Sequence, residues 1–246
     1  MLKETIVRCL HGHFTRQELK MRYLPAVGII ISSSLLAAWL LYPPELHYSI
    51  FTDTISDLGD WSTNTSGWWG FAVAMWVMGS SFIPLYLYVH HRLTPMRPKE
   101  TLAGTFFSLV GCVCVFCIGI FDDVDLPIAG AILWSNVHSM FDIVGFSCLG
   151  LGIVFHGRVL GKGEKLPARQ EQNAGAKRFI PPHWLMSCLG IATGISLIFK
   201  IVLYPGLGLV SPGLTSTTFW EWLILGGMIA YVFWLVIILP EEIPEK

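Results

Sequence analysis

The chain of 246 residues is 53% hydrophobic and 13% charged, with a formal net charge of -1 and a mean hydropathy of +0.59. Soluble domains carry about 25% charged residues, so this composition indicates an integral membrane protein. A nearly neutral chain offers no broad basic surface, and no nucleic-acid partner is expected.

Six stretches are apolar enough to form helices that cross a bilayer, which takes about 20 mostly apolar residues. The first 23 residues lack the continuous apolar core and the cleavage site of a signal peptide, so the first span is expected to stay as an anchor. The sequence therefore predicts an all-α, polytopic membrane helix bundle over residues 24–240, with an amino-terminal segment at 1–23 and a tail at 241–246. The expected spans are 24–42, 67–89, 101–121, 132–156, 183–203 and 219–239.

Lysine and arginine are divided unequally among the connections between these spans. Fourteen of the 16 lie in the amino-terminal segment, in the connection after the second span, and in the stretch after the fourth. The loops 43–66, 122–131 and 204–218 contain none. Because basic residues collect on the cytoplasmic side, both termini are predicted to be cytoplasmic and these three loops to lie on the other side, called outer below. The stretch from Arg158 to Arg178 is predicted to be a polar linker.

Cysteine and histidine spacing gives two weak metal signals. Cys114 and Cys117 share a helix face, and Cys9 is followed by His11 and His13. Neither group completes a four-ligand site, and cysteine in an apolar stretch usually acts as a small hydrophobe. No cofactor is therefore predicted, although an acidic outer site could take a divalent cation.

The first outer loop contains the segment TDTISDLG, residues 52–59. Thr54 followed by Asp57 resembles a capping box, and Gly59 suits a helix stop, so one short turn of helix is predicted here. Such a turn would fix Ser56 and Asp57 above the outer ends of the spans.

The fourth span carries an ionisable pair in its outer half. His138 lies about two turns from the outer end and Asp142 about three, at 1.5 Å per residue, and their spacing puts them on one face. A charge inside a span costs about 2.5–3.5 kcal/mol and marks a functional candidate. Asp142 could orient His138 as an acid, base or ligand. Alternatively, the pair ties helices together, because Gly145 and Gly152 continue a small-residue stripe that packs against other helices.

Three further ionisable residues gather at the outer ends of the spans. Lys200 and Glu221 lie near the outer ends of the fifth and sixth spans, and Asp122 follows the third. Because these ionisable residues, like His138 and Asp142, lie towards the outer side, the sequence predicts one polar cavity that opens outward. The structural interpretations are a salt bridge between Lys200 and Glu221, which is favoured, and a solvated loop around Asp122.

These motifs also carry a resemblance to known families. DTISDLG between the first two spans, GIFDDVD at the outer end of the third, and an inward His138 resemble the domain-of-unknown-function 998 membrane proteins. The resemblance covers about residues 24–240 and implies a six-helix fold without an assigned activity. That family often has a Phe-Pro pair before the acidic residue, whereas Phe121 directly precedes Asp122 here. ISDLG is more distantly similar to a segment of the DRAM and GPI-remodelling six-helix proteins, which implies lipid handling.

Three functions fit these observations. The first is binding of a lipid or small amphiphile in the outer cavity, with membrane lipids as the partners. The second is a lipid hydrolase or transferase within the membrane, with His138 and Asp142 as the acid–base pair and Ser56, Asp57 or Asp122 completing the site. HSMFDIVG resembles the end of the lipid phosphatase signature, whose other elements are missing. The third is a proton-coupled transporter, although no internal repeat is visible.

Overall fold

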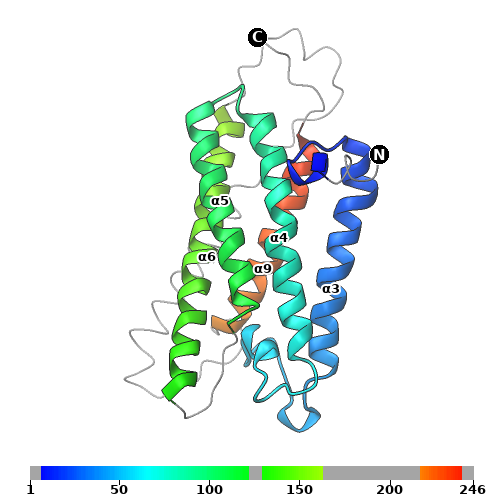
Figure 1. The fold of residues 1–246 in the computed structure, drawn as a ribbon, viewed down its shortest axis with the longest axis vertical. Coiled ribbons are helices and arrows are strands. Elements are labelled where there is room, and N and C mark those ends of the chain that lie inside the picture. Colours follow the sequence, from blue (N-terminus) through cyan, green and yellow to red (C-terminus); the bar gives the residue numbers. More distant parts are fainter. Residues whose placement is uncertain (1–6, 122–128, 163–216, 240–246) are drawn as a thin grey trace.

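The computed structural model describes residues 7–121, 129–162 and 217–239 (Figure 1). Among these residues every regular element is helical. The short helix α2 (Arg16–Glu18) and a π-helical turn (Leu19–Tyr23) lead directly into the first long helix. The long helices are α3 (Leu24–Leu40), α4 (Trp68–Leu93), α5 (Pro98–Ile118), α6 (Ala129–Lys162) and α9 (Thr217–Ile238).

Four helical segments are long and apolar enough to cross a membrane, and α9 contains a shorter apolar stretch, Glu221–Ile237. These segments are Arg16–Leu40, Trp68–Leu93, Pro98–Ile118 and Val137–Leu160. The all-helical fold with membrane-type helices is therefore confirmed for the described part of the chain. The predicted span 183–203 lies outside the described residues, so the total of six spans and the position of the termini stay predictions.

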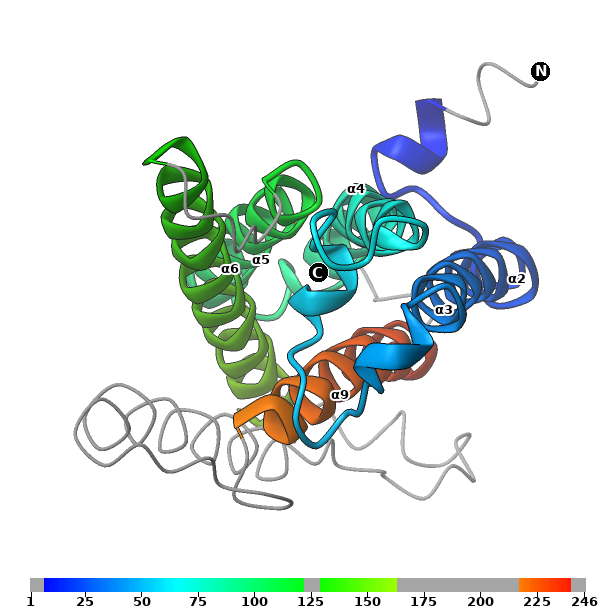
Figure 2. The same cartoon turned by 90° about the horizontal axis from the view of Figure 1, so that it is seen from below.

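Consecutive helices are neighbours, and α9 closes the open side of the row (Figure 2). Gly28 of α3 lies against the ring of Phe233 of α9. On the other side, the Tyr231 hydroxyl of α9 donates to the Ile153 carbonyl of α6. The bundle thus has two ends, the loop end formed by residues 41–67 and the amino-terminal end that carries residues 7–15 (Figure 1).

Helix ends differ from the predicted boundaries for local reasons. The last turn of α4 extends to Leu93, which is fully buried, and its basic residues suit a helix carboxyl end. Helix α6 continues to Lys162, into the predicted polar linker, because Val159 is still buried. Helix α5 ends at Ile118, earlier than predicted, where Gly119 passes close to the Ala72 carbonyl of α4.

Helices α5 and α6 approach each other through glycines. A Cβ atom on Gly152 would lie 2.1 Å from the Ser108 hydroxyl oxygen and 3.1 Å from the Gly104 carbonyl oxygen. A Cβ atom on Gly145 would lie 2.9 Å from the Cβ of Cys114. The predicted small-residue stripe of the fourth span is therefore a helix contact surface, as such stripes are in membranes.

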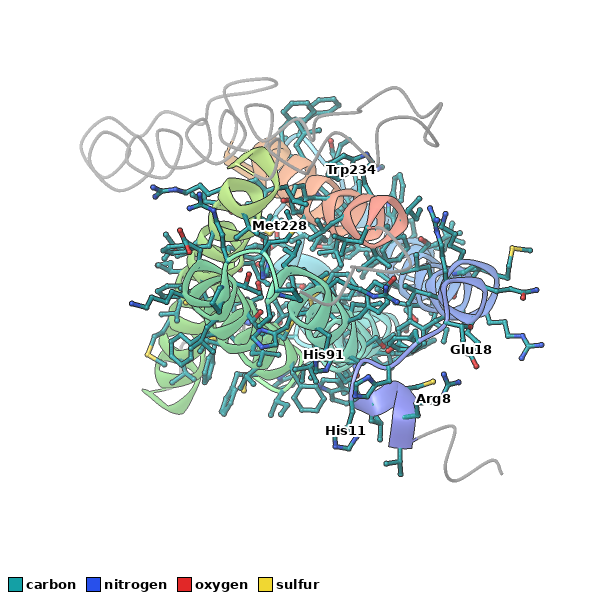
Figure 3. All side chains as sticks on the ribbon, turned by 90° about the horizontal axis from the view of Figure 1, so that it is seen from above. Arg8, His11, Glu18, His91, Met228 and Trp234 are labelled. Carbon is teal, nitrogen blue, oxygen red and sulfur yellow. The ribbon has the colours of Figure 1, made fainter. Side chains whose placement is uncertain are left out.

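The segment 7–15 packs over the end of α4 (Figure 3). Gly12 has a φ of +76°, and a Cβ atom there would lie 2.5 Å from the Tyr88 amide nitrogen. The His91 ring stacks on His13 at 4.6 Å between centroids, and its Nε2 donates to the His11 carbonyl. Backbone contact and ring stacking therefore hold this segment on the bundle.

Replacing Gly152 by alanine is expected to lower the free energy of unfolding by about 1–3 kcal/mol, because the Ser108 hydroxyl would be displaced and α5 would have to shift slightly away from α6. Gly150 gives the matched control, since nothing lies within 4 Å of a Cβ atom there. Gly150→Ala should leave stability unchanged or raise it slightly. Thermal unfolding in detergent measures both, and equal destabilisation by the two variants would contradict the assigned packing.

Candidate functional site

The segment TDTISDLG forms the predicted capped turn. Residues Ser56–Gly59 are a 3-10 helix. The Thr54 amide donates to Asp57 Oδ2 at 2.6 Å, and the Asp57 amide donates to Thr54 Oγ1 at 3.2 Å, so both halves of the capping box are present. Gly59 ends the turn without a positive φ. A Cβ atom there would lie 2.2 Å from the Phe71 ring, so close packing requires this glycine.

Other carboxylates of this loop also bind the loop itself. Asp53 Oδ2 accepts from the Ser49 amide at 2.8 Å and from the Thr52 hydroxyl at 2.7 Å. The buried Asp60 accepts from the amide and hydroxyl of Ser62. These acceptors satisfy amides that the turns leave without helical partners. The acidic residues of the loop thus have a structural role.

Asn64 joins this loop to two helices. Its side chain is 0% exposed and donates to the carbonyls of Ala38, at 3.1 Å, and Leu58, at 2.8 Å. Its Oδ1 accepts from the Gly67 amide at 3.0 Å. One amide group therefore connects the end of α3, the 3-10 turn and the start of α4. The sequence does not predict this role, because asparagine is common in loops and turns of every kind.

Tyr48 joins the loop to α9. Its hydroxyl donates to the Thr54 carbonyl at 2.8 Å and accepts from Trp222 Nε1 at 3.2 Å. The rings of Phe51 and Phe219 stack beside this contact at 5.5 Å between centroids. Burial raises the pKa of the Tyr48 hydroxyl, which therefore stays protonated and remains a donor.

His138 is the buried imidazole at the loop end of α6, with 3% of its surface exposed. Its Nδ1 donates to the Phe121 carbonyl just beyond α5, at 2.5 Å. A carbonyl can only accept, so this bond fixes the proton on Nδ1 and makes Nε2 the acceptor of the neutral ring. The group bonded to Nδ1 of His138 is therefore a backbone carbonyl, and the orientation of this ring by Asp142 stays a prediction. Asp142 is half-buried on the same helix and makes an interaction of its own.

The other predicted site residues fall into three sets. Ser56 and Asp57 lie together in the capped turn, where the Ser56 hydroxyl bonds to that of Thr54. Glu221 is half-buried at the start of α9. Asp122 and Lys200 lie outside the described residues. The outward cavity and the salt bridge between Lys200 and Glu221 consequently stay predictions.

A second polar cluster, absent from the sequence analysis, lies towards the amino-terminal end. His90 Nδ1 of α4 lies 3.0 Å from the Thr105 hydroxyl of α5, which lies 3.4 Å from Nε2 of His156 on α6. His156 is 0% exposed and stacks on the Tyr86 ring at 6.0 Å between centroids. The sequence does not predict this cluster, because its contacts join side chains of three helices and depend on how each helix is rotated.

In the described part of the chain, no group of three or more His, Cys, Asp or Glu side chains is placed to hold a metal ion. His13 of the predicted weak metal signal stacks on His91 instead. Comparisons with models of protein families, with curated proteins and with solved structures find no match to this chain. The resemblance to the domain-of-unknown-function 998 proteins stays a prediction.

Asn64→Ala is expected to reduce the free energy of unfolding by about 3 kcal/mol, because buried backbone groups of both helices and the loop lose their partner. Thr65→Ala is the control, because Thr65 is next to Asn64 in the sequence and its side chain is exposed. Thermal unfolding in detergent gives the comparison. Two variants of equal stability would show that the Asn64 bonds do not hold the loop.

The raised pKa of Tyr48 makes the stability of the protein depend on pH. Because the pKa of the hydroxyl is above the ordinary value of 10.0 in the folded chain, its contribution to the free energy of unfolding is complete below about pH 10 and is lost as the pH rises further. Tyr48→Phe should be less stable than the unchanged protein at neutral pH by about 1 kcal/mol. The difference should be constant up to about pH 10, the ordinary pKa of tyrosine, and should shrink above it. Melting temperatures of both proteins between about pH 8 and 11 give the measurement. A constant difference would contradict the role of the hydroxyl.

Proposed function

We propose that this chain is a multi-pass membrane protein that binds a lipid or small amphiphile at the loop end of its bundle. The distribution of basic residues supports a non-cytoplasmic position for this end. The observation that carries the proposal is the buried, oriented imidazole of His138 among helices whose outer faces are apolar.

The apolar faces support contact with lipid chains. Large hydrophobic side chains are exposed along several helices, where water would be an unfavourable neighbour. In a bilayer the same faces contact acyl chains at no such cost. They include Ile29, Leu36, Leu40, Leu102, Phe106, Val113, Ile143 and Leu151.

His138 supports binding of a polar group near the membrane surface. Its Nδ1 is fixed by the Phe121 carbonyl, so Nε2 is the ring nitrogen available for recognition. The neutral ring accepts a hydrogen bond from a hydroxyl or amine, and the protonated ring pairs with a phosphate. Lipid head groups carry all of these. Tyr48 and Trp222 add an aromatic contact at the same end, and such residues favour membrane interfaces.

A lipid hydrolase or transferase is the second candidate, because an imidazole oriented through Nδ1 is suited to act as a base through Nε2. The loop gives this candidate less support. Asp57 and Asp53 accept backbone hydrogen bonds, and the Ser56 hydroxyl is bonded to Thr54. These groups are committed to the turn, and binding without catalysis needs nothing further from them.

Native mass spectrometry of the detergent-purified protein tests the proposal with three variants. His138→Ala removes both ring nitrogens and should abolish retention of a co-purified lipid. His138→Asn keeps a donor near the Phe121 carbonyl but loses the group at Nε2, and it should fail equally. Met140→Ala is the control, because Met140 is exposed on the same helix, and it should retain the lipid.

Recovery of full lipid retention by His138→Asn would show that His138 only joins α5 to α6. Absence of any lipid or amphiphile from the unchanged protein would reject the binding function. Incubation with mixed phospholipids separates the enzyme from the binding protein, since turnover that depends on His138 would favour the hydrolase or transferase.

A further inference from the structure

We propose that His90, Thr105 and His156 form a proton relay, which leads from the amino-terminal end of the bundle to a buried imidazole between α4, α5 and α6. The relay lies at the opposite end from His138 and does not depend on the proposed lipid site.

The three side chains form a continuous hydrogen-bonded row. His90 lies in the last turn of α4, next to the exposed His91, and is itself partly exposed. Its Nδ1 is 3.0 Å from Thr105 Oγ1, which is 3.4 Å from His156 Nε2. Exposure therefore falls from one end of the row to the other, since Thr105 and His156 are both buried.

A threonine hydroxyl between two imidazoles can pass on a proton because it donates and accepts at once. The His90 Nδ1 proton moves to Thr105 Oγ1 as the hydroxyl proton moves to His156 Nε2. His90 regains a proton at Nε2 from water, and the ring of His156 releases one from Nδ1 to a water molecule or a polar ligand group. Each bond to hydrogen that breaks is matched by one that forms, and no electron is transferred.

The buried end of the row has the atom that such a relay needs. His156 Nδ1 is buried and has no hydrogen-bond partner among the described residues. A buried polar atom in this state is destabilising, and its presence calls for an explanation such as a bound water or a catalytic role. The Thr101 hydroxyl, one helical turn from Thr105, is also buried without a described partner. The relay explains why Nδ1 of His156 has no partner, because Nδ1 is the atom from which the proton leaves.

The surroundings of His156 favour passage of a proton over its storage. Tyr86 and His90 face it from α4, and the hydroxyls of Thr105 and Ser108 belong to the α5 surface packed on α6. From α9, Tyr231 reaches the neighbouring Ile153 carbonyl. The titratable group that acts on His156 through its charge is His90, which is of like sign when protonated. The groups that face His156 from these helices include no carboxylate that would hold a proton on its ring.

Solid-state NMR of the full chain in liposomes, with 15N-labelled histidine rings, tests the relay. His156 signals are assigned by their loss in His156→Gln. Exchange of the ring protons with water is measured at about pH 6.5, near the ordinary pKa of imidazole. We expect exchange at His156 in the unchanged protein and its loss in Thr105→Val, which removes the hydroxyl but keeps the shape of the side chain.

Thr105→Ser restores a hydroxyl and should restore exchange. Thr94→Val is the matched control, because the Thr94 hydroxyl donates only to the His90 carbonyl and lies outside the row. His138 signals in the same spectra report whether each variant is folded. If Thr105→Val does not fold, His90→Gln, which removes the entry group, should give the same loss. Wild-type exchange at His156 in a folded Thr105→Val or His90→Gln variant would overturn the relay.

Discussion

The close approach of α5 and α6 is the constraint on which both polar sites depend. Gly152 and Gly145 let the backbones meet where any larger side chain would collide with α5. At one end of this contact the Phe121 carbonyl reaches His138, and at the other the Thr105 hydroxyl reaches His156. Hydrogen bonds weaken steeply beyond about 3.5 Å, so a small separation of the two helices would break both contacts.

A second constraint applies at the loop end, because backbone amides beside an apolar medium need hydrogen-bond partners within the protein. Asp53, Asp57 and Asn64 meet it by bonding to main-chain groups of their own loop and of the adjoining helix ends. The polar segment between the first two spans is therefore a folded cap. This function explains its carboxylates before any chemistry is invoked, and it leaves His138 as the better candidate for recognition.

The sequence predicted what local physics determines. Span positions follow from apolar length, and the turn at Ser56–Gly59 follows from the spacing of Thr54 and Asp57. The partners of His138 and His156 could not be predicted, because they depend on how each helix is rotated and on how closely its neighbour packs. Hydropathy gives the length of a span but not its rotation. Gly59 was correctly placed at the end of a turn but for a different reason, since the Phe71 ring lies where its side chain would be.

Helix α6 presents an imidazole near each of its ends. His138 and His156 are separated by about 27 Å along the helix at 1.5 Å per residue, which approaches the hydrocarbon thickness of a bilayer. Between them α6 buries the apolar side chains of Leu149 and Ile153. The glycine contact with α5, at Gly145 and Gly152, lies between the two imidazoles, so the positions of both depend on the packing of the same helix pair.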